Sequence, residues 1–163
     1  MIRKGVTLAF VILAATQASA LSCIRPSIEN SFRQYQNAKE TYILALGKLT
    51  NKHNVVPADD TPNGQGEARG ESFVATFKGW QATRGGFDRP LNVTVAVRAT
   101  CLSVWCGQVS AEREMLTFLE KTAFGYLLTD GPCGGTAFYD PDKDIKRRAL
   151  QCLRGGVCEP QIR

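Results

Sequence analysis

Six cysteines are the residues in this chain with the most distinctive chemistry. One neighbouring pair is five residues apart and another is six apart, and the chain has a single histidine. Zinc sites use tighter C-x-x-C pairs, so we expect no metal, and an even cysteine number favours three disulfides in an exported chain. The cysteines are Cys23, Cys101, Cys106, Cys133, Cys152 and Cys158.

His53 and the acid pair Asp59–Asp60 lie in a polar stretch of the sequence. A catalytic histidine needs partners within hydrogen-bond reach, and none is indicated nearby, so we expect a solvated loop residue. The acid pair could contact calcium from a loop, although a solvated loop also accounts for it. The sequence predicts no catalytic group and no cofactor.

A second acid cluster and a glycine pair have structural explanations. Asp140, Asp142 and Asp144 lack the glycine and the distant glutamate of a calcium loop, and they fit the start of a helix with Asp140 as its cap. Gly134–Gly135 lacks the Lys-Ser/Thr of a phosphate loop. We expect a turn that holds a disulfide there.

Aromatic and basic side chains suggest two further binding modes. Trp80 and Trp105 could stack on a sugar, but we expect them to pack in the core or at a barrel end. A basic face on the last helix reads as a solvated surface, with an anionic envelope component as the alternative partner. That face consists of Lys143, Lys146, Arg147, Arg148 and Arg154.

Residues 1–20 have the layout of a secretory signal peptide. Arg3 and Lys4 precede a short apolar run, and the small residues Ala18-Ser19-Ala20 follow it. The run is shorter than the about 20 residues that cross a bilayer, so we expect cleavage after Ala20 and no transmembrane segment. The alternative of a lipid anchor on Cys23 is disfavoured, because Ala20 stands where a lipoprotein signal has a leucine-like residue.

The net charge and the chain length limit which partners and how many domains are expected. Removing residues 1–20 lowers the net charge from +5 to +3, because Arg3 and Lys4 leave with them. That mild charge and the predicted export argue against nucleic acid as a partner. Residues 21–163 are enough for a single domain in the periplasm or outside the cell.

Hydrophobic periodicity predicts a mainly β fold with a helix at each end. Ser27 can cap a first helix, and a second helix runs from Asp140 to Leu153. The stretches 51–70 and 81–90 read as loops, the first long enough to be mobile or functional. Strands are expected at 41–50, 71–79, 91–99, 114–120 and 124–129, with a short helix as the alternative for 114–120. Five such strands can close into a small Greek-key barrel of the oligonucleotide/oligosaccharide-binding (OB) type, stabilised by disulfides.

Several short motifs occur in an order that resembles a known family. Cys23, a short helix near Phe32, the strand YILALGKL (42–49), FKGW (77–80) and Cys106-Gly107 before Cys133 follow one another along the chain. This order resembles the tissue inhibitors of metalloproteinases, the netrin-like modules and their bacterial secreted relatives. The resemblance implies a five-stranded barrel with flanking helices across most of residues 21–153.

The resemblance also implies roles for the mature N-terminus. In the animal inhibitors the first cysteine presents its amine and carbonyl to the protease zinc, and the next side chain enters the specificity pocket. Leu21 and Ser22 match these positions. Because Leu21 is not a cysteine, the disulfide that clamps the first residue is missing. Ordering the N-terminus on binding would then cost entropy and lower the affinity.

The same resemblance narrows the disulfide pairing. It implies Cys23–Cys133 and leaves Cys106 without its family partner. Cys101 is then its nearest partner, and Cys152 is left with Cys158. The alternative joins Cys23 to Cys106 and Cys101 to Cys133.

Two functions remain after this comparison. The first is a non-enzymatic binding module that recognises an unknown protein or an envelope component. The alternative is a metalloproteinase inhibitor that acts through Leu21 and Ser22.

Overall fold

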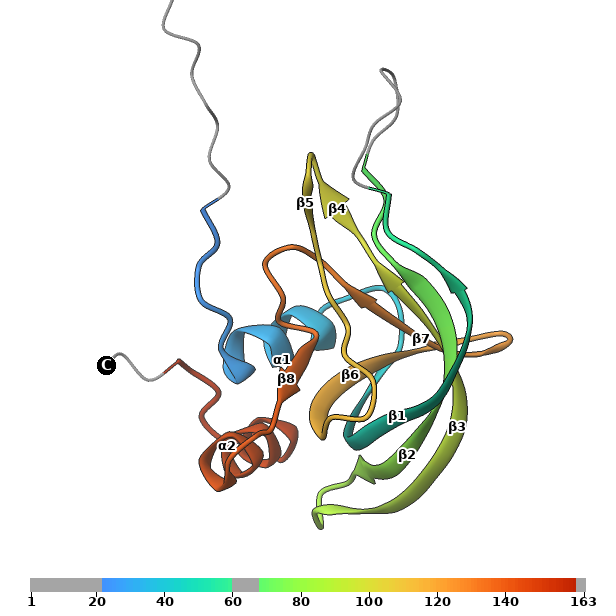
Figure 1. The fold of residues 1–163 in the computed structure, drawn as a ribbon. Coiled ribbons are helices and arrows are strands. Elements are labelled where there is room, and N and C mark those ends of the chain that lie inside the picture. The colour runs from blue at the N-terminus through green and yellow to red at the C-terminus, as the bar shows by residue number, and fades with distance from the viewer. Residues whose placement is uncertain (1–21, 60–67, 161–163) are drawn as a thin grey trace, which may run out of the picture.

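The computed structural model describes residues 22–59 and 68–160. Five strands close into a small barrel, and two helices pack side by side against its outside (Figure 1). The elements are α1 (Ile28–Gln36), β1 (Tyr42–Val56), β2 (Ser72–Ala82), β3 (Phe87–Ala99), β4 (Cys101–Leu102), β5 (Trp105–Cys106), β6 (Met115–Thr122), β7 (Gly125–Asp130), β8 (Ala137–Tyr139) and α2 (Lys143–Leu153).

The barrel has the strand order of a Greek-key OB fold. β1 pairs with β2, β2 with β3, β3 with β7, β7 with β6, and β6 returns to β1. The pairing of β3 with β7 is parallel and the other four are antiparallel. The three-residue β8 pairs with the first residues of β6. The expected fold class, a mainly β, OB-like barrel with a helix at each end, is confirmed.

A pair of glycines lets β1 bend from one barrel neighbour to the next. Gly47 lies directly opposite Gly79 on β2 and opposite Met115 on β6. A Cβ added to Gly79 would lie 2.1 Å from the backbone oxygen of Leu46 and 2.6 Å from the Cα of Gly47. Only glycine permits this approach of two backbones, so the pair is a requirement for closing the barrel.

Two apolar clusters hold the fold together, one inside the barrel and one beneath the helices. Ala45 and Leu49 of β1 point inward, and Leu44 points outward to the helices. In β6, Met115 and Leu119 face the interior while Phe118 faces α1. These two strands are therefore buried on both faces, which explains why their sequences lack the polar alternation seen in β3.

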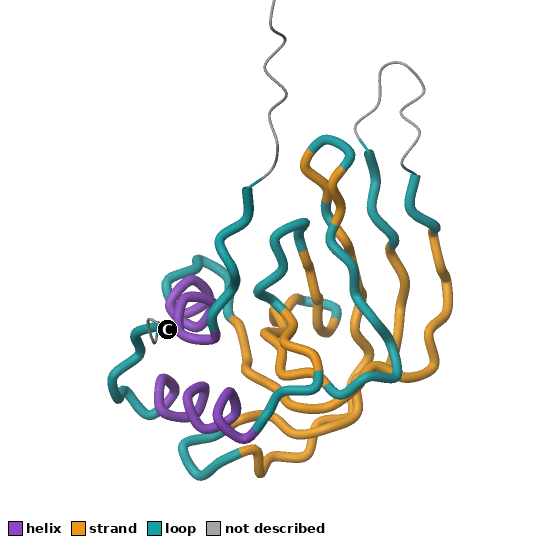
Figure 2. Tube along the Cα trace, turned by 60° about the vertical axis from the view of Figure 1, so that its left-hand side comes forward, coloured by secondary structure: helices purple, strands orange, loops and turns teal. Residues whose placement is uncertain are grey.

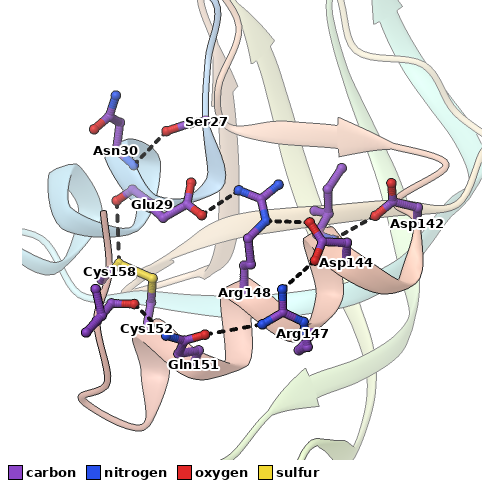
Figure 3. Close-up of polar contacts among 12 residues, drawn as sticks. Ser27, Glu29, Asn30, Asp142, Asp144, Arg147, Arg148, Gln151, Cys152 and Cys158 are labelled. Atoms are coloured by element: carbon purple, nitrogen blue, oxygen red, sulfur yellow. Dashed lines mark hydrogen bonds and ion pairs between the residues drawn. A yellow bond between two sulfur atoms is a disulfide. The ribbon is translucent and has the colours of Figure 1, made fainter. Parts of the chain in front are cut away.

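Polar contacts fix the two helices to each other (Figure 3). The Ser27 side chain accepts a hydrogen bond from the amide of Asn30 and caps α1. Buried Glu29 of α1 forms an ion pair with Arg148 of α2. The tail after α2 folds back, because Cys152 is bonded to Cys158. The Sγ of Cys158 lies 3.7 Å from the backbone oxygen of Glu29, a packing contact because a disulfide sulfur carries no hydrogen.

The three disulfides join Cys23 to Cys133, Cys101 to Cys106 and Cys152 to Cys158. These are the pairs that the sequence analysis favoured over the alternative. The first ties the N-terminal segment to the loop after β7, and the second closes the β4–β5 hairpin. The third fastens the C-terminal tail to α2.

Two predicted loops are shorter than expected. β1 continues to Val56, because bulges at Asn51 and Asn54, with φ of 54° and 51°, let pairing with β2 resume after each register shift. The expectation that 51–70 is all loop was therefore wrong for 51–56, and 60–67 lies outside the described residues. The stretch predicted as a loop at 81–90 is reduced to residues 83–86 between β2 and β3.

The cap of the second helix was also misplaced. Asp142 is the N-cap, and its side chain accepts from the amide of Ile145 at 2.7 Å. Asp140 has a φ of 46° and forms an ion pair with Arg113 instead. Pro141 separates the two acids, so the helix begins after it.

Candidate functional site

The β4–β5 hairpin carries the most prominent exposed apolar surface of the barrel. Leu102, Val104 and Trp105 are 59%, 58% and 55% exposed. We call these three side chains the hairpin tip. Trp105 was expected to pack against the protein, and that expectation was wrong because the hairpin projects away from the barrel end (Figures 1 and 2).

Covalent and backbone bonds hold the base of this hairpin. Cys101 and Cys106 are paired across it and joined by a disulfide. The Thr100 amide donates to the backbone oxygen of Asp130 at 2.8 Å, and the Gly107 amide donates to that of Thr100 at 2.9 Å. A Cβ on Gly107 would lie 2.3 Å from the Asp130 oxygen, so the base packs directly onto the end of β7. The tip is therefore presented on a fixed support.

A groove of about 360 Å³ lies beside the hairpin. Pro57 and Ala58 of the β1–β2 arm line it together with the segment that follows the hairpin, Cys106–Ser110, and with Phe73 of β2. We define the arm as residues 51–59 and 68–74; it extends from the same end of the barrel as the hairpin (Figure 1). Val55 and Val56 on the arm are each nearly half exposed. Glu71, Gln108 and Ser110 also line the groove, so its surface is mixed. We call the hairpin, the groove and the arm together the binding end.

A buried polar cluster supports this end from beneath. Asp130 is 6% exposed, and its Oδ1 has no hydrogen-bond partner among the described residues. Burial raises the pKa of this carboxyl, and hydrogen bonds from Thr136 and the backbone of Gln108 act in the opposite direction. The hydroxyl of Tyr139 accepts from the Ser110 amide at 2.8 Å. These bonds fix the groove wall to β7 and β8.

The N-terminal segment is a second exposed feature. Residues 22–26 are exposed, and the bond from Cys23 to Cys133 pins them beside the loop after β7. A groove of about 400 Å³ runs between this segment, α1 and Gly134–Gly135. Ser22 lines it, whereas Leu21 lies outside the described residues.

His53 and Asp59 make contacts with residues near them in the β1–β2 arm. His53 is exposed as expected, although it belongs to β1, and its Nδ1 lies 2.8 Å from the Asn51 oxygen. Asp59 faces Arg69 across the arm at 3.6 Å, and Asp60 lies outside the described residues. Within residues 22–59 and 68–160, no group of three or more His, Cys, Asp or Glu side chains is arranged to hold a metal ion.

The basic face of α2 is largely occupied by contacts within the protein. Lys146, Arg147 and Arg148 form ion pairs with acidic residues. Arg154 donates to two backbone oxygens of the turn between β2 and β3. These pairs reduce the charge available to an anionic partner and weaken that alternative.

Gly134–Gly135 and Trp80 are the last two features for which the sequence made a prediction. Gly134 and Gly135 adopt φ of 63° and 99° directly after the disulfide-bonded Cys133, which is the expected turn. Trp80 was expected to pack in the core or at a barrel end. It is 47% exposed on the outer face of β2, so packing in the core was wrong.

The hairpin tip was not predicted from the sequence. The sequence feature that could have indicated it is the apolar run between Cys101 and Cys106. A run this short cannot reach into the core when a disulfide joins its two ends. No helix in the described ranges is long and apolar enough to cross a membrane. No protein-family model, curated protein or solved structure matches this chain.

Proposed function

We propose that this protein is an exported, non-enzymatic binding module that holds a protein of the cell envelope or its surroundings at the binding end of its barrel. The observation that carries the proposal is the hairpin tip, three apolar side chains more than half exposed on a loop closed by a disulfide. Isolated exposed apolar residues are common, but three together on a projecting loop indicate an interaction site.

The energetics favour a protein partner. Aromatic side chains that fill a partner's pocket supply much of the binding energy in protein interfaces. Trp105 has that chemistry, and Leu102 lies opposite it in the hairpin register. The bond between Cys101 and Cys106 lowers the entropy that the loop loses on binding, because the loop is already ordered. The neighbouring groove can accommodate a segment of the same partner.

Export is part of the proposal. The signal-like residues 1–20 and three disulfides both suit an oxidising compartment, the periplasm or the exterior. We propose cleavage between Ala20 and Leu21. The barrel order and the Cys23–Cys133 bond support a relationship to the netrin-like modules and the tissue inhibitors of metalloproteinases.

Quantitative affinity capture tests this function. The mature protein and a triple variant, Leu102→Ser with Val104→Ser and Trp105→Ser, are used to capture proteins from the envelope fraction. The matched control is Phe124→Ser, because Phe124 is a fully exposed aromatic residue at the β6–β7 turn. We expect one or a few proteins to be retained by the wild type and the control and lost with the triple variant. Equal recovery with all three would reject the proposal.

A second function, inhibition of a zinc protease through Leu21 and Ser22, is favoured by one observation. Ser22 stands exposed directly before Cys23, which is fixed to Cys133. Cys106, which would clamp the first residue in the animal inhibitors, is bonded to Cys101 instead. The test is a panel of zinc proteases with the native and the acetylated N-terminus. Nanomolar inhibition that acetylation abolishes would establish this function, and its absence would reject it.

A further inference from the structure

A further cleft lies away from the groove beside the hairpin and adjoins the groove of the N-terminal segment, with which it shares Gln34, Cys133 and Gly134. It has a volume of about 340 Å³. Its lining comes from the end of α1, the start of β1, the end of β6 and the loop after β7. Gln34, Tyr35, Tyr42 and Glu120 line it together with Thr129 of β7 and the loop residues 131–134 and 136.

Two tyrosines form one wall, and their positions are fixed. The ring of Tyr35 stacks on Phe118 at 4.6 Å and tilts against Tyr42 at the same centroid distance. The Tyr35 hydroxyl lies 2.5 Å from Oγ1 of Thr136. The anchored Tyr35 in turn supports the ring of Tyr42, which is only partly buried.

The other determinant is negative charge. Glu120 lies directly opposite Tyr42 in the pairing of β6 with β1. No lysine or arginine in the described part of the chain forms an ion pair with Glu120. Burial raises the pKa of Tyr42, and the charge of Glu120 and a hydrogen bond from the Tyr42 hydroxyl to the Glu120 carboxylate add to that effect. The pKa of Tyr35 is also raised, mainly by burial. The hydrogen bond with Thr136 lowers this pKa, and the charge of Asp130 raises it. Glu120 is the one charged side chain among the residues that line the cleft.

An apolar pocket adjoins the cleft at Tyr35 and Tyr42. It has a volume of about 240 Å³, and Tyr35 and Tyr42 line both spaces. Phe32, Phe118 and Leu153 supply its other apolar surface. A ligand that spans both spaces would place a polar group beside Glu120 and an apolar chain beside Phe118.

We infer that this cleft binds a small alkylammonium ion, with its ammonium group between Glu120 and the Tyr42 ring and its carbon chain in the apolar pocket. An ammonium group is attracted to the face of an aromatic ring and donates charge-assisted hydrogen bonds to a carboxylate. The hydrocarbon chain gains by leaving water. A carboxylate ligand of the same length would be repelled by Glu120.

Titrations of the ¹⁵N-labelled protein with three six-carbon probes test this inference by NMR. Hexylamine, hexanol and hexanoate share a chain and differ in the charged group. We expect hexylamine to shift the amides of Tyr42, Glu120 and Thr136 saturably and to bind about tenfold more tightly than hexanol. Hexanoate should give no saturable shift at these amides.

Two variants complete the test. Glu120→Gln should weaken hexylamine binding about tenfold while leaving hexanol unchanged. Glu112→Gln, which removes an exposed carboxylate paired with Lys48 elsewhere on the barrel, should leave both unchanged. Equal affinities for hexylamine and hexanol in the wild type, shifts scattered over the surface, or no effect of Glu120→Gln would each overturn the inference.

Discussion

Glu29 of α1 is only 2% exposed, and its Oε1 accepts a hydrogen bond of 2.5 Å from Nη1 of Arg148 on α2 (Figure 3). Its second oxygen is buried without a hydrogen-bond partner among the described residues. The Nε of Arg148 also donates to Asp144 at 2.9 Å. Among the described residues, Arg148 is thus the charged group that compensates this buried carboxylate between the two helices.

Replacing Arg148 with Met should therefore destabilise the protein strongly. The change leaves the charge of Glu29 buried and uncompensated, which typically costs about 3–5 kcal/mol. Urea denaturation measures the loss in the free energy of unfolding. Arg147→Met is the control, because Arg147 pairs with Asp144 at the exposed surface, and its effect should be much smaller. Equal losses for the two variants would contradict this role of Arg148.

The disulfides should differ in their contributions to stability. Cys23 and Cys133 are 110 residues apart, so losing that bond should cost about 4–5 kcal/mol through the entropy of the unfolded chain. Cys101 and Cys106 are five residues apart, and the same relation gives about 2 kcal/mol. Denaturation of the two paired Cys→Ser variants measures both values. A larger loss from the hairpin pair would show that the hairpin holds the barrel together.

Gly79→Ala should prevent proper closure of the barrel. The added methyl group would lie 2.1 Å from the Leu46 oxygen, in the middle of the pairing between β1 and β2. We expect a loss of about 3 kcal/mol or more, measured by thermal and urea unfolding.

Gly131→Ala is the matched control for that substitution. The nearest atom to its new methyl group, Oγ1 of Thr100, is 3.4 Å away. Its stability should stay within about 1 kcal/mol of the wild type. A stable Gly79→Ala variant would mean that the strands can separate at this point without cost.

Asp130→Asn should change how stability depends on pH. Burial raises the pKa of Asp130 in the folded protein above the about 3.9 of an unfolded chain. The folded state then retains the proton longer, so this residue lowers stability as pH rises from about 4 through the folded pKa. The variant should gain stability relative to the wild type over that interval. Urea denaturation at several pH values measures the difference, and a difference independent of pH would contradict the prediction.

The barrel could be predicted from sequence because its strands carry local signals. In β3, the valines 93, 95 and 97 alternate with exposed Asn92 and Thr94, as a strand with one buried face requires. Ser27 marks the start of α1 through its side-chain cap. These features depend only on residues that are neighbours in the chain, so they can be recognised in a single sequence.

Other features depend on contacts that no local pattern encodes. The bulges at Asn51 and Asn54 interrupt the alternation of β1, and only its pairing with β2 continues the strand. The short β8 is defined by its partner β6. Tyr35, Tyr42 and Glu120 come together because α1 packs across two strands that are far apart in the sequence.

Photo-crosslinking in cells tests the proposed binding end most directly. A benzoylphenylalanine is placed at Val104 on the hairpin tip, and the control position is Asn92, which is exposed on the outer face of β3. We expect a discrete crosslinked species from position 104, weakened by Leu102→Ser, and no such species from position 92. No crosslinked species from position 104, or the same species from both positions, would contradict the claim that this protein binds its partner through the β4–β5 hairpin.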